Sequence, residues 1–203
     1  NLVITGLIII GGLGFTVVTD VYRCRRFSKL SLHSKLVLTV TALLIIIGTM
    51  VILNLEYTNP KTMGHFPFYR KLLGAYFQAV TPRTAGFSTL PIGEMRTATL
   101  FFTIILMFIG ASPGSTGGGV KTSTFGTLLM AVYAVVRGRE DVEIFGRRLP
   151  HRIVYRALAV VMISLALVIV NTMILSITEG GMFLRVLFEV MSAFGTVGLS
   201  TGI

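Results

Sequence analysis

The chain has 203 residues, of which 53% are hydrophobic and 13% are charged. A soluble domain carries about 25% charged residues, so this composition excludes an ordinary soluble domain and predicts an integral membrane protein. The single cysteine, Cys24, excludes an internal disulfide framework and a metal site built from several cysteines.

The first predicted element is an uncharged apolar helix over 1–19, close to the length of about 20 residues that crosses a bilayer. It carries a Gly-Gly-Leu-Gly patch at 11–14, where small residues let another helix approach closely. A connection over 21–35 follows and holds five basic residues. Basic clusters occur at nucleic-acid interfaces, but beside apolar spans they favour the cytoplasmic side of a membrane. We therefore expect a cytoplasmic connection and no nucleic acid.

A second apolar helix is predicted over 36–55 and ends before the Asn59-Pro60 turn signal. The amphipathic stretch 69–80 is too short to span a membrane. It leads into a segment rich in Thr, Gly and Ser at 84–89, which has turn chemistry at both ends.

The apolar stretch 97–136 is interrupted near its middle by Ser-Pro-Gly-Ser-Thr-Gly-Gly-Gly at 112–119. Neither half alone is comfortably long enough to span, whereas together they cross with a non-helical break near mid-depth. Such backbone is tolerated in a membrane only where protein surrounds it or it lines a watery cavity, so the break predicts a transport pathway. Lys121 follows the break, where it could repel a cation in a closed state or extend to the cytoplasmic side.

A second basic connection covers 137–151. The basic cluster around it comprises Arg137, Arg139, Arg147, Arg148, Arg152 and Arg156 and is partly offset by Glu140, Asp141 and Glu143. It is expected on the cytoplasmic side as well. A further span over 157–178 and a short helix over 183–194 follow.

The end of the chain repeats the order of its middle: a full helix, a short helix, then an extended segment with glycine. Thr84, Gly86, Ser88 and Thr89 match Thr196, Gly198, Ser200 and Thr201 in type and spacing. A short helix that enters the membrane halfway and returns as extended chain is a re-entrant pore loop. The negative end of its dipole favours a cation, and its backbone carbonyls can replace the hydration shell of that cation. Arg83 could brace such a loop by pairing with Glu94 or Glu189, or could lie exposed at its mouth.

These motifs resemble those of the Trk/Ktr/HKT superfamily of potassium transporters, and above all the bacterial Ktr/Trk membrane subunit. The similarity is carried by 84–88, 110–122 and 196–200. It implies helix–pore-loop–helix units around a central pore, with one helix interrupted by an intramembrane loop. On this basis 1–20 is the closing helix of an upstream repeat, 36–136 is a complete repeat with a broken second helix, and 152–203 begins the next repeat and stops after its pore loop. We expect the chain to be part of a longer protein.

The resemblance also implies the roles of individual residues. K+ would bind at the backbone carbonyls of Gly86 and Gly198. The ion filter would comprise Thr84, Ala85, Gly86, Phe87, Thr196, Val197, Gly198 and Leu199. The gate loop would comprise Ser112, Pro113, Gly114, Ser115, Thr116, Gly117, Gly118, Gly119 and Lys121, with the hydroxyls of Ser112, Ser115 and Thr116 able to reach the pore.

The function so implied is that of the pore-forming subunit of a potassium uptake system in a bacterial cell membrane, with K+ as the transported ion and no cofactor in this chain. The family resemblance further implies a multi-pass homodimer that binds a cytosolic regulatory subunit with nucleotide-binding domains. A Na+-permeable or Na+-coupled member of the same superfamily is an alternative. An intramembrane enzyme is another, but it needs an Asp pair or a Ser/His pair at membrane depth; we expect no catalytic residue.

Overall fold

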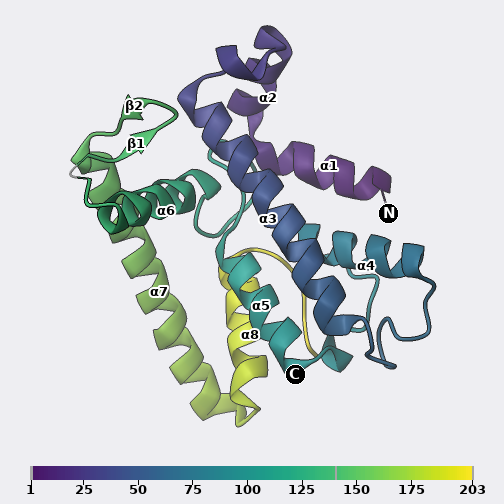
Figure 1. Cartoon of the computed structure of the whole chain (residues 1–203). Helices are drawn as coiled ribbons and strands as arrows, with labels where there is room; N and C mark the ends of the chain where they lie inside the picture. Colours follow the sequence, from purple (N-terminus) through teal and green to yellow (C-terminus); the bar gives the residue numbers. More distant parts are fainter. Residues whose placement is uncertain (1, 140, 203) are drawn as a thin grey trace.

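The computed structural model describes residues 2–139 and 141–202; Asn1, Glu140 and Ile203, which fall within the ranges predicted above, lie outside the described residues. The described chain is helical, as predicted, apart from one small hairpin and the connecting loops (Figure 1). Its helices are α1 (Leu2–Leu13), α2 (Phe15–Cys24), α3 (Leu32–Glu56), α4 (Phe68–Val80), α5 (Thr97–Phe108), α6 (Thr122–Val136), α7 (His151–Glu179) and α8 (Phe183–Phe194), with 3-10 turns at Phe27–Lys29 and Ile92–Glu94.

Two helices of the described chain, α3 and α7, are each long and apolar enough to cross a membrane, and α1 with α2 forms a third candidate if the bent pair is one span. Helix α3 begins four residues earlier than predicted, because the Ser31 hydroxyl caps it by accepting a hydrogen bond from the Ser34 N–H. Helix α7 follows Pro150, which suits the start of a helix. Arg152 and Arg156, which belong to the second basic cluster of the sequence, therefore lie on helix α7 and not in the connection before it.

The prediction of one continuous helix over 1–19 is wrong. The chain bends by 98° between α1 and α2. The break falls at Gly14, whose φ of 82° lies in the left-handed region that helical residues do not adopt. The glycine patch therefore produces a corner in the backbone. At Gly11 and Gly12, by contrast, an added Cβ atom would meet no other group within 4 Å, so no helix approaches closely there among the described residues.

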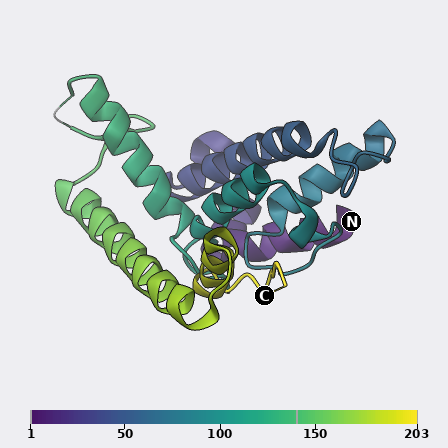
Figure 2. The ribbon, with the colours of Figure 1, turned by 90° about the horizontal axis from the view of Figure 1, so that it is seen from below.

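Helices α5 and α8 lie at the centre of the molecule, between α6 and α7 on one side and α1, α3 and α4 on the other (Figure 2). The core follows this arrangement: Leu100, Ile104 and Met107 of α5 pack in one buried cluster with Phe188 and Met191 of α8. The rings of Phe108 and Phe194 stack with centroids 6.1 Å apart where the two helices end. Helices α5 and α8 thus both end inside the protein, and the loop that follows each of them starts there.

The connection between α6 and α7 contains an antiparallel hairpin that the sequence did not indicate. Its strands are β1 (Glu143–Ile144) and β2 (Arg147–Arg148), paired Glu143 with Arg148 and Ile144 with Arg147. An ion pair of 2.9 Å joins Arg148 to Asp141. The hairpin buries Ile144 at the ends of the helices, so this connection is an ordered cover over α6.

Candidate functional site

The segments after α4 and α8 have the same backbone conformation. Thr84 and Gly86 have φ values of 60° and 71°, and Thr196 and Gly198 have φ values of 52° and 82°. A non-glycine residue with positive φ is uncommon, and here a threonine takes it at the matching place in both segments. The internal repeat seen in the sequence is therefore also a repeat of local structure.

The two segments lie in contact through their glycines. A Cβ atom added to Gly86 would lie 2.6 Å from the carbonyl oxygen of Val197 and 3.5 Å from Cα of Gly198. One added to Gly198 would lie 3.6 Å from Cα of Gly86. Only glycine fits where two backbones approach this closely. The structure thus brings together the residues that the sequence predicted as two parts of one filter.

The other predicted filter residues differ in exposure. Val197 and Leu199 are buried, Thr84 and Ala85 are half-buried, and Phe87 is 59% exposed. The Thr81 hydroxyl donates to the carbonyl of Phe87 and holds the first segment against the end of its own helix. The exposed groups are Thr196 and Gly198, together with Phe87.

Glu189 on α8 braces the second segment. Its Oε1 atom accepts hydrogen bonds from the Ser200 hydroxyl at 3.0 Å, the Thr201 N–H at 2.6 Å and the Thr201 hydroxyl at 2.9 Å. In the first segment the Ser88 hydroxyl donates to the Leu90 carbonyl at 2.6 Å instead. Both serines therefore hold the backbone in place.

Arg83 pairs with neither carboxylate proposed for it, and it is not exposed at a mouth. Glu189 accepts its hydrogen bonds from Ser200 and Thr201. Glu94 forms an ion pair of 2.6 Å with Lys61, and this contact lowers the pKa of the Glu94 carboxyl below its ordinary value. Arg83 is 7% exposed, and within the described residues its Nη2 atom has no hydrogen-bond partner. Gln78, one turn earlier on α4, is fully buried and its amide also lacks a partner there.

The segment between α5 and α6 is a non-helical loop whose two ends lie side by side. Its two ends pair as extended backbone, with the Gly110 N–H donating to the Val120 carbonyl at 2.9 Å and the Val120 N–H to the Phe108 carbonyl at 3.0 Å. Gly114 and Gly119 have φ values of 74° and 71°. A Cβ atom on Gly110 would lie 1.9 Å from the Gly118 carbonyl oxygen. The run of glycines is therefore needed for the loop to fold back on itself.

Polar side chains fasten this loop from within. The hydroxyls of Ser112 and Thr122 lie 2.8 Å apart, and the Ser115 hydroxyl donates to the Ser112 carbonyl at 2.6 Å. Two of the three hydroxyls expected to reach a pore are thus engaged inside the loop, whereas Thr116 is exposed. The Lys121 ammonium donates to the Gly117 carbonyl. Lys121 therefore contacts the loop directly, and the two roles considered for its charge stay predictions.

The loop also touches both filter segments. A Cβ atom on Gly117 would lie 2.6 Å from the Thr84 hydroxyl oxygen, and one on Gly118 would lie 2.6 Å from that of Thr196. The Gly118 N–H donates to the Thr196 hydroxyl at 3.0 Å. Two adjacent glycines therefore meet the two equivalent threonines.

On another side the loop rests against the corner between α1 and α2. The Ser112 N–H donates to the Gly12 carbonyl at 2.9 Å and the Phe15 N–H to the Gly114 carbonyl at 3.3 Å. A Cβ atom on Gly14 would lie 2.5 Å from the Pro113 carbonyl oxygen. The backbone around Gly14 therefore packs directly against the loop and helps to position it. The local sequence gave no reason to expect this contact.

Sequence reasoning also missed a buried carboxylate at the end of α3. Glu56 is fully buried and accepts hydrogen bonds from the side chains of Asn59, Thr62 and Thr99 and from the N–H of Arg96. It ties the end of α3 to the start of α5. In the sequence, the one feature that could have indicated this carboxylate is its position directly after the apolar run 36–55.

Comparisons with known proteins show the family and the fold of the chain. The family model described as TrkH, cation transport protein, matches residues 1–203. The chain is 50% identical to the Ktr system potassium uptake protein B of Bacillus subtilis over its whole length, which is 46% of that protein. It is 43% identical to the potassium/sodium uptake protein NtpJ of Enterococcus hirae, again over 46% of that protein.

The chain therefore spans about half the length of these curated relatives. The crystal structure of the potassium transporter TrkH from Vibrio parahaemolyticus shares the fold, with a TM-score of 0.78 at 20% identity over 96% of this chain and 42% of that one. The family and these relatives are ion transporters, which excludes the intramembrane enzyme considered above. The chain is a helical membrane protein and belongs to the TrkH family of cation transport proteins.

Proposed function

We propose that this chain forms part of the pore of a potassium uptake protein, with Gly86 and Gly198 in its ion filter and residues 112–119 as a gate beneath them. One observation carries the proposal: two loops with the same left-handed residues meet at Gly86 and Gly198. Backbone carbonyls presented by such loops can replace the hydration shell of K+. The filter segment comprising Thr84, Ala85, Gly86 and Phe87 and the one comprising Thr196, Val197, Gly198 and Leu199 supply these groups.

The gate in this proposal is held shut by a few polar contacts. The bond from Gly118 to Thr196 joins the loop to one filter threonine, and the bond from Lys121 to the Gly117 carbonyl holds the part of the loop that lies close to the other, Thr84. Hydrogen bonds of this kind each contribute about 1–3 kcal/mol. Breaking one of them is within reach of the coupling energies of about 1–3 kcal/mol that regulate other proteins, so the loop can move in steps without unfolding the helices.

Rubidium uptake tests the proposal in a bacterial cell that lacks its own potassium uptake. The full-length protein is compared with a Gly86→Ser variant and with a deletion of residues 112–119. We expect the serine to reduce the preference for rubidium over sodium, because its side chain collides with the Val197 carbonyl. The deletion is expected to leave a constant leak. Equal uptake and equal preference in all three proteins would refute the proposal.

A sodium-permeable or sodium-coupled transporter is the second candidate, and the name of the 43% identical relative mentions both ions. Sodium uptake by the same cells separates the two candidates. We favour potassium because both filter positions in this chain hold glycine.

We further propose that the complete protein is a homodimer in the bacterial cell membrane and binds a cytosolic regulatory subunit with nucleotide-binding domains. The basic stretches 22–35 and 137–156 are the surfaces we assign to that subunit, with contact to anionic lipid as the alternative. Light scattering of the purified full-length protein tests the dimer. Replacing Arg25 and Arg26 with Gln is expected to weaken binding of the regulatory subunit.

A further inference from the structure

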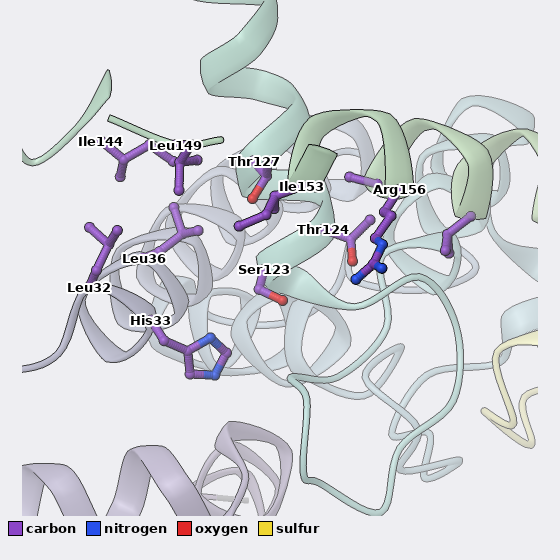
Figure 3. A pocket seen from close by; sticks show the side chains of 12 residues that line it. Leu32, His33, Leu36, Ser123, Thr124, Thr127, Ile144, Leu149, Ile153 and Arg156 are labelled. Atoms are coloured by element: carbon purple, nitrogen blue, oxygen red, sulfur yellow. The ribbon is translucent and has the colours of Figure 1, made fainter. Parts of the chain in front are cut away.

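A cavity of about 470 Å³ lies where α3, α6 and α7 meet the hairpin, within the usual range of about 300–1,000 Å³ for ligand sites. Figure 3 shows side chains from all four elements around it, among them His33, Ser123, Thr124 and Arg156. Most of its wall is apolar. The apolar lining residues are Leu32, Leu36, Ile144, Leu149, Ile153, Ala157 and Val160.

The polar groups in this cavity have no partner in the part of the chain that the structure describes. The guanidinium of Arg156, the imidazole of His33 and the hydroxyls of Ser123, Thr124 and Thr127 line the space, and no hydrogen bond or ion pair engages them there. One permanent cation, an imidazole and several hydroxyls together form a donor set that suits a phosphate ester. The cavity thus offers hydrogen-bond donors to a phosphate group and an apolar surface to the hydrocarbon part of the same ligand.

We propose that this cavity binds the headgroup of an anionic phospholipid. A free phosphate ion would use the polar groups alone, but the walls continue into an apolar hollow of about 300 Å³ that shares Leu36 and Ile144 with the cavity. That hollow is lined by α3 as far as Leu43, by α6 as far as Met130 and by Phe145 of the hairpin, and this mostly apolar lining suits an acyl chain. A headgroup in the cavity and a chain in the hollow account for both spaces.

The position within the fold favours the same ligand. The cavity lies at the first turns of α3 and α7, the two helices long and apolar enough to span a membrane, and basic residues cluster in the connections beside it. A basic residue near an anionic membrane surface contributes about 1 kcal/mol to lipid binding. The polar end of a lipid therefore meets positive charge at the depth where its headgroup lies.

Binding here would also act on the loop after α5. Ser123 and Thr124 follow Thr122, whose hydroxyl contacts that of Ser112 in the loop. A bound headgroup would fix the first turn of α6 and, through Thr122, the end of the loop. This consequence rests on the proposed gate, whereas the binding site itself does not.

Native mass spectrometry of the purified full-length protein tests the site. Phosphatidylglycerol and phosphatidylcholine with the same acyl chains are added separately. We expect phosphatidylglycerol to bind more tightly, and Arg156→Gln to weaken its binding about five-fold without changing that of phosphatidylcholine. Arg152→Gln is the matched control, because Arg152 lies one turn away on α7 and is exposed like Arg156, but it does not line the cavity.

His33→Gln is a second variant on a different helix and is expected to weaken phosphatidylglycerol binding alone. Thermal unfolding of each variant identifies any loss of fold. Equal affinity of Arg156→Gln and the unaltered protein for phosphatidylglycerol would overturn the site, as would equal affinity for the two lipids. Displacement of phosphatidylglycerol by millimolar inorganic phosphate would assign the cavity to a free anion instead.

Discussion

At the scale of single residues, the charge on Lys121 matters through one hydrogen bond. Its ammonium donates to the Gly117 carbonyl of the loop, and a bond to a charged group contributes about 1.5–3 kcal/mol. Lys121→Met should therefore raise rubidium uptake by the full-length protein about ten-fold, because the loop is released. Lys121→Arg keeps a donor and a charge and should stay near the level of the unaltered protein. Unchanged uptake in Lys121→Met would show that the bond does not hold the gate.

Glu189 is the residue on which the shape of the second filter segment depends most directly. Its carboxylate accepts three hydrogen bonds from Ser200 and Thr201, and a neutral amide accepts each less strongly. We expect Glu189→Gln to lower the free energy of unfolding by about 1–2 kcal/mol and to reduce the preference for rubidium over sodium. Glu179→Gln, at the exposed end of α7, is the control. A thermal melt and an uptake ratio identical to those of the control would contradict this role.

At the scale of elements, the corner between α1 and α2 is predicted to control the seat of the loop. Gly14 has a positive φ, and a side chain there would meet the Pro113 carbonyl at 2.5 Å. Gly14→Ala should cost about 1–2 kcal/mol in backbone strain alone and displace the loop, which thermal unfolding and rubidium leak would both record. Gly11→Ala is the matched change, since a side chain at Gly11 meets nothing within 4 Å and alanine favours the helix. Equal behaviour of the two variants would show that the corner does not position the loop.

The elements also show how far the sequence could predict this fold. The short helices and the break after α5 were predictable, because each is marked by a change from apolar to glycine-rich sequence within a few residues. The bend at Gly14 was not, because glycine is common in membrane helices and the residues on both sides of it are apolar. The hairpin has strands of only two residues, which leaves no alternating pattern to detect.

The candidate site was predictable in its parts and not in its assembly. Matching Thr-x-Gly motifs predicted two equivalent segments, and the glycine run predicted the loop. The bond from Gly118 to Thr196, by contrast, joins residues far apart in the chain. The four donors around Glu56 likewise come from separate segments. Such contacts depend on how helices pack, which a single sequence does not specify.

At the scale of the whole molecule, the chain exposes more surface than a compact protein of its mass. Its accessible surface is 11370 Å² at 22.1 kDa, against about 9,300 Å² for a typical globular monomer. Only 17% of the spanning window of α7 is buried. An apolar helix this exposed needs lipid or further protein around it, in keeping with relatives about twice as long. Gln78 and the Nη2 atom of Arg83, which lie buried near Thr84, likewise have no hydrogen-bond partner among the residues that the structure describes.

The internal repeat makes a prediction about the molecule as one pore. If both segments line a shared axis, Gly198→Ser should also reduce the rubidium-to-sodium uptake ratio, because its φ of 82° strains any other residue although a Cβ atom there collides with nothing. Because the two glycines are in contact, the double variant should lose less than the product of the two single effects, as residues in contact are not independent. Gly202→Ser is the control: Gly202 has a φ of 79° but meets nothing within 4 Å. A loss in Gly86→Ser alone, with Gly198→Ser like Gly202→Ser, would mean that the repeat is structural and that one segment alone selects the ion.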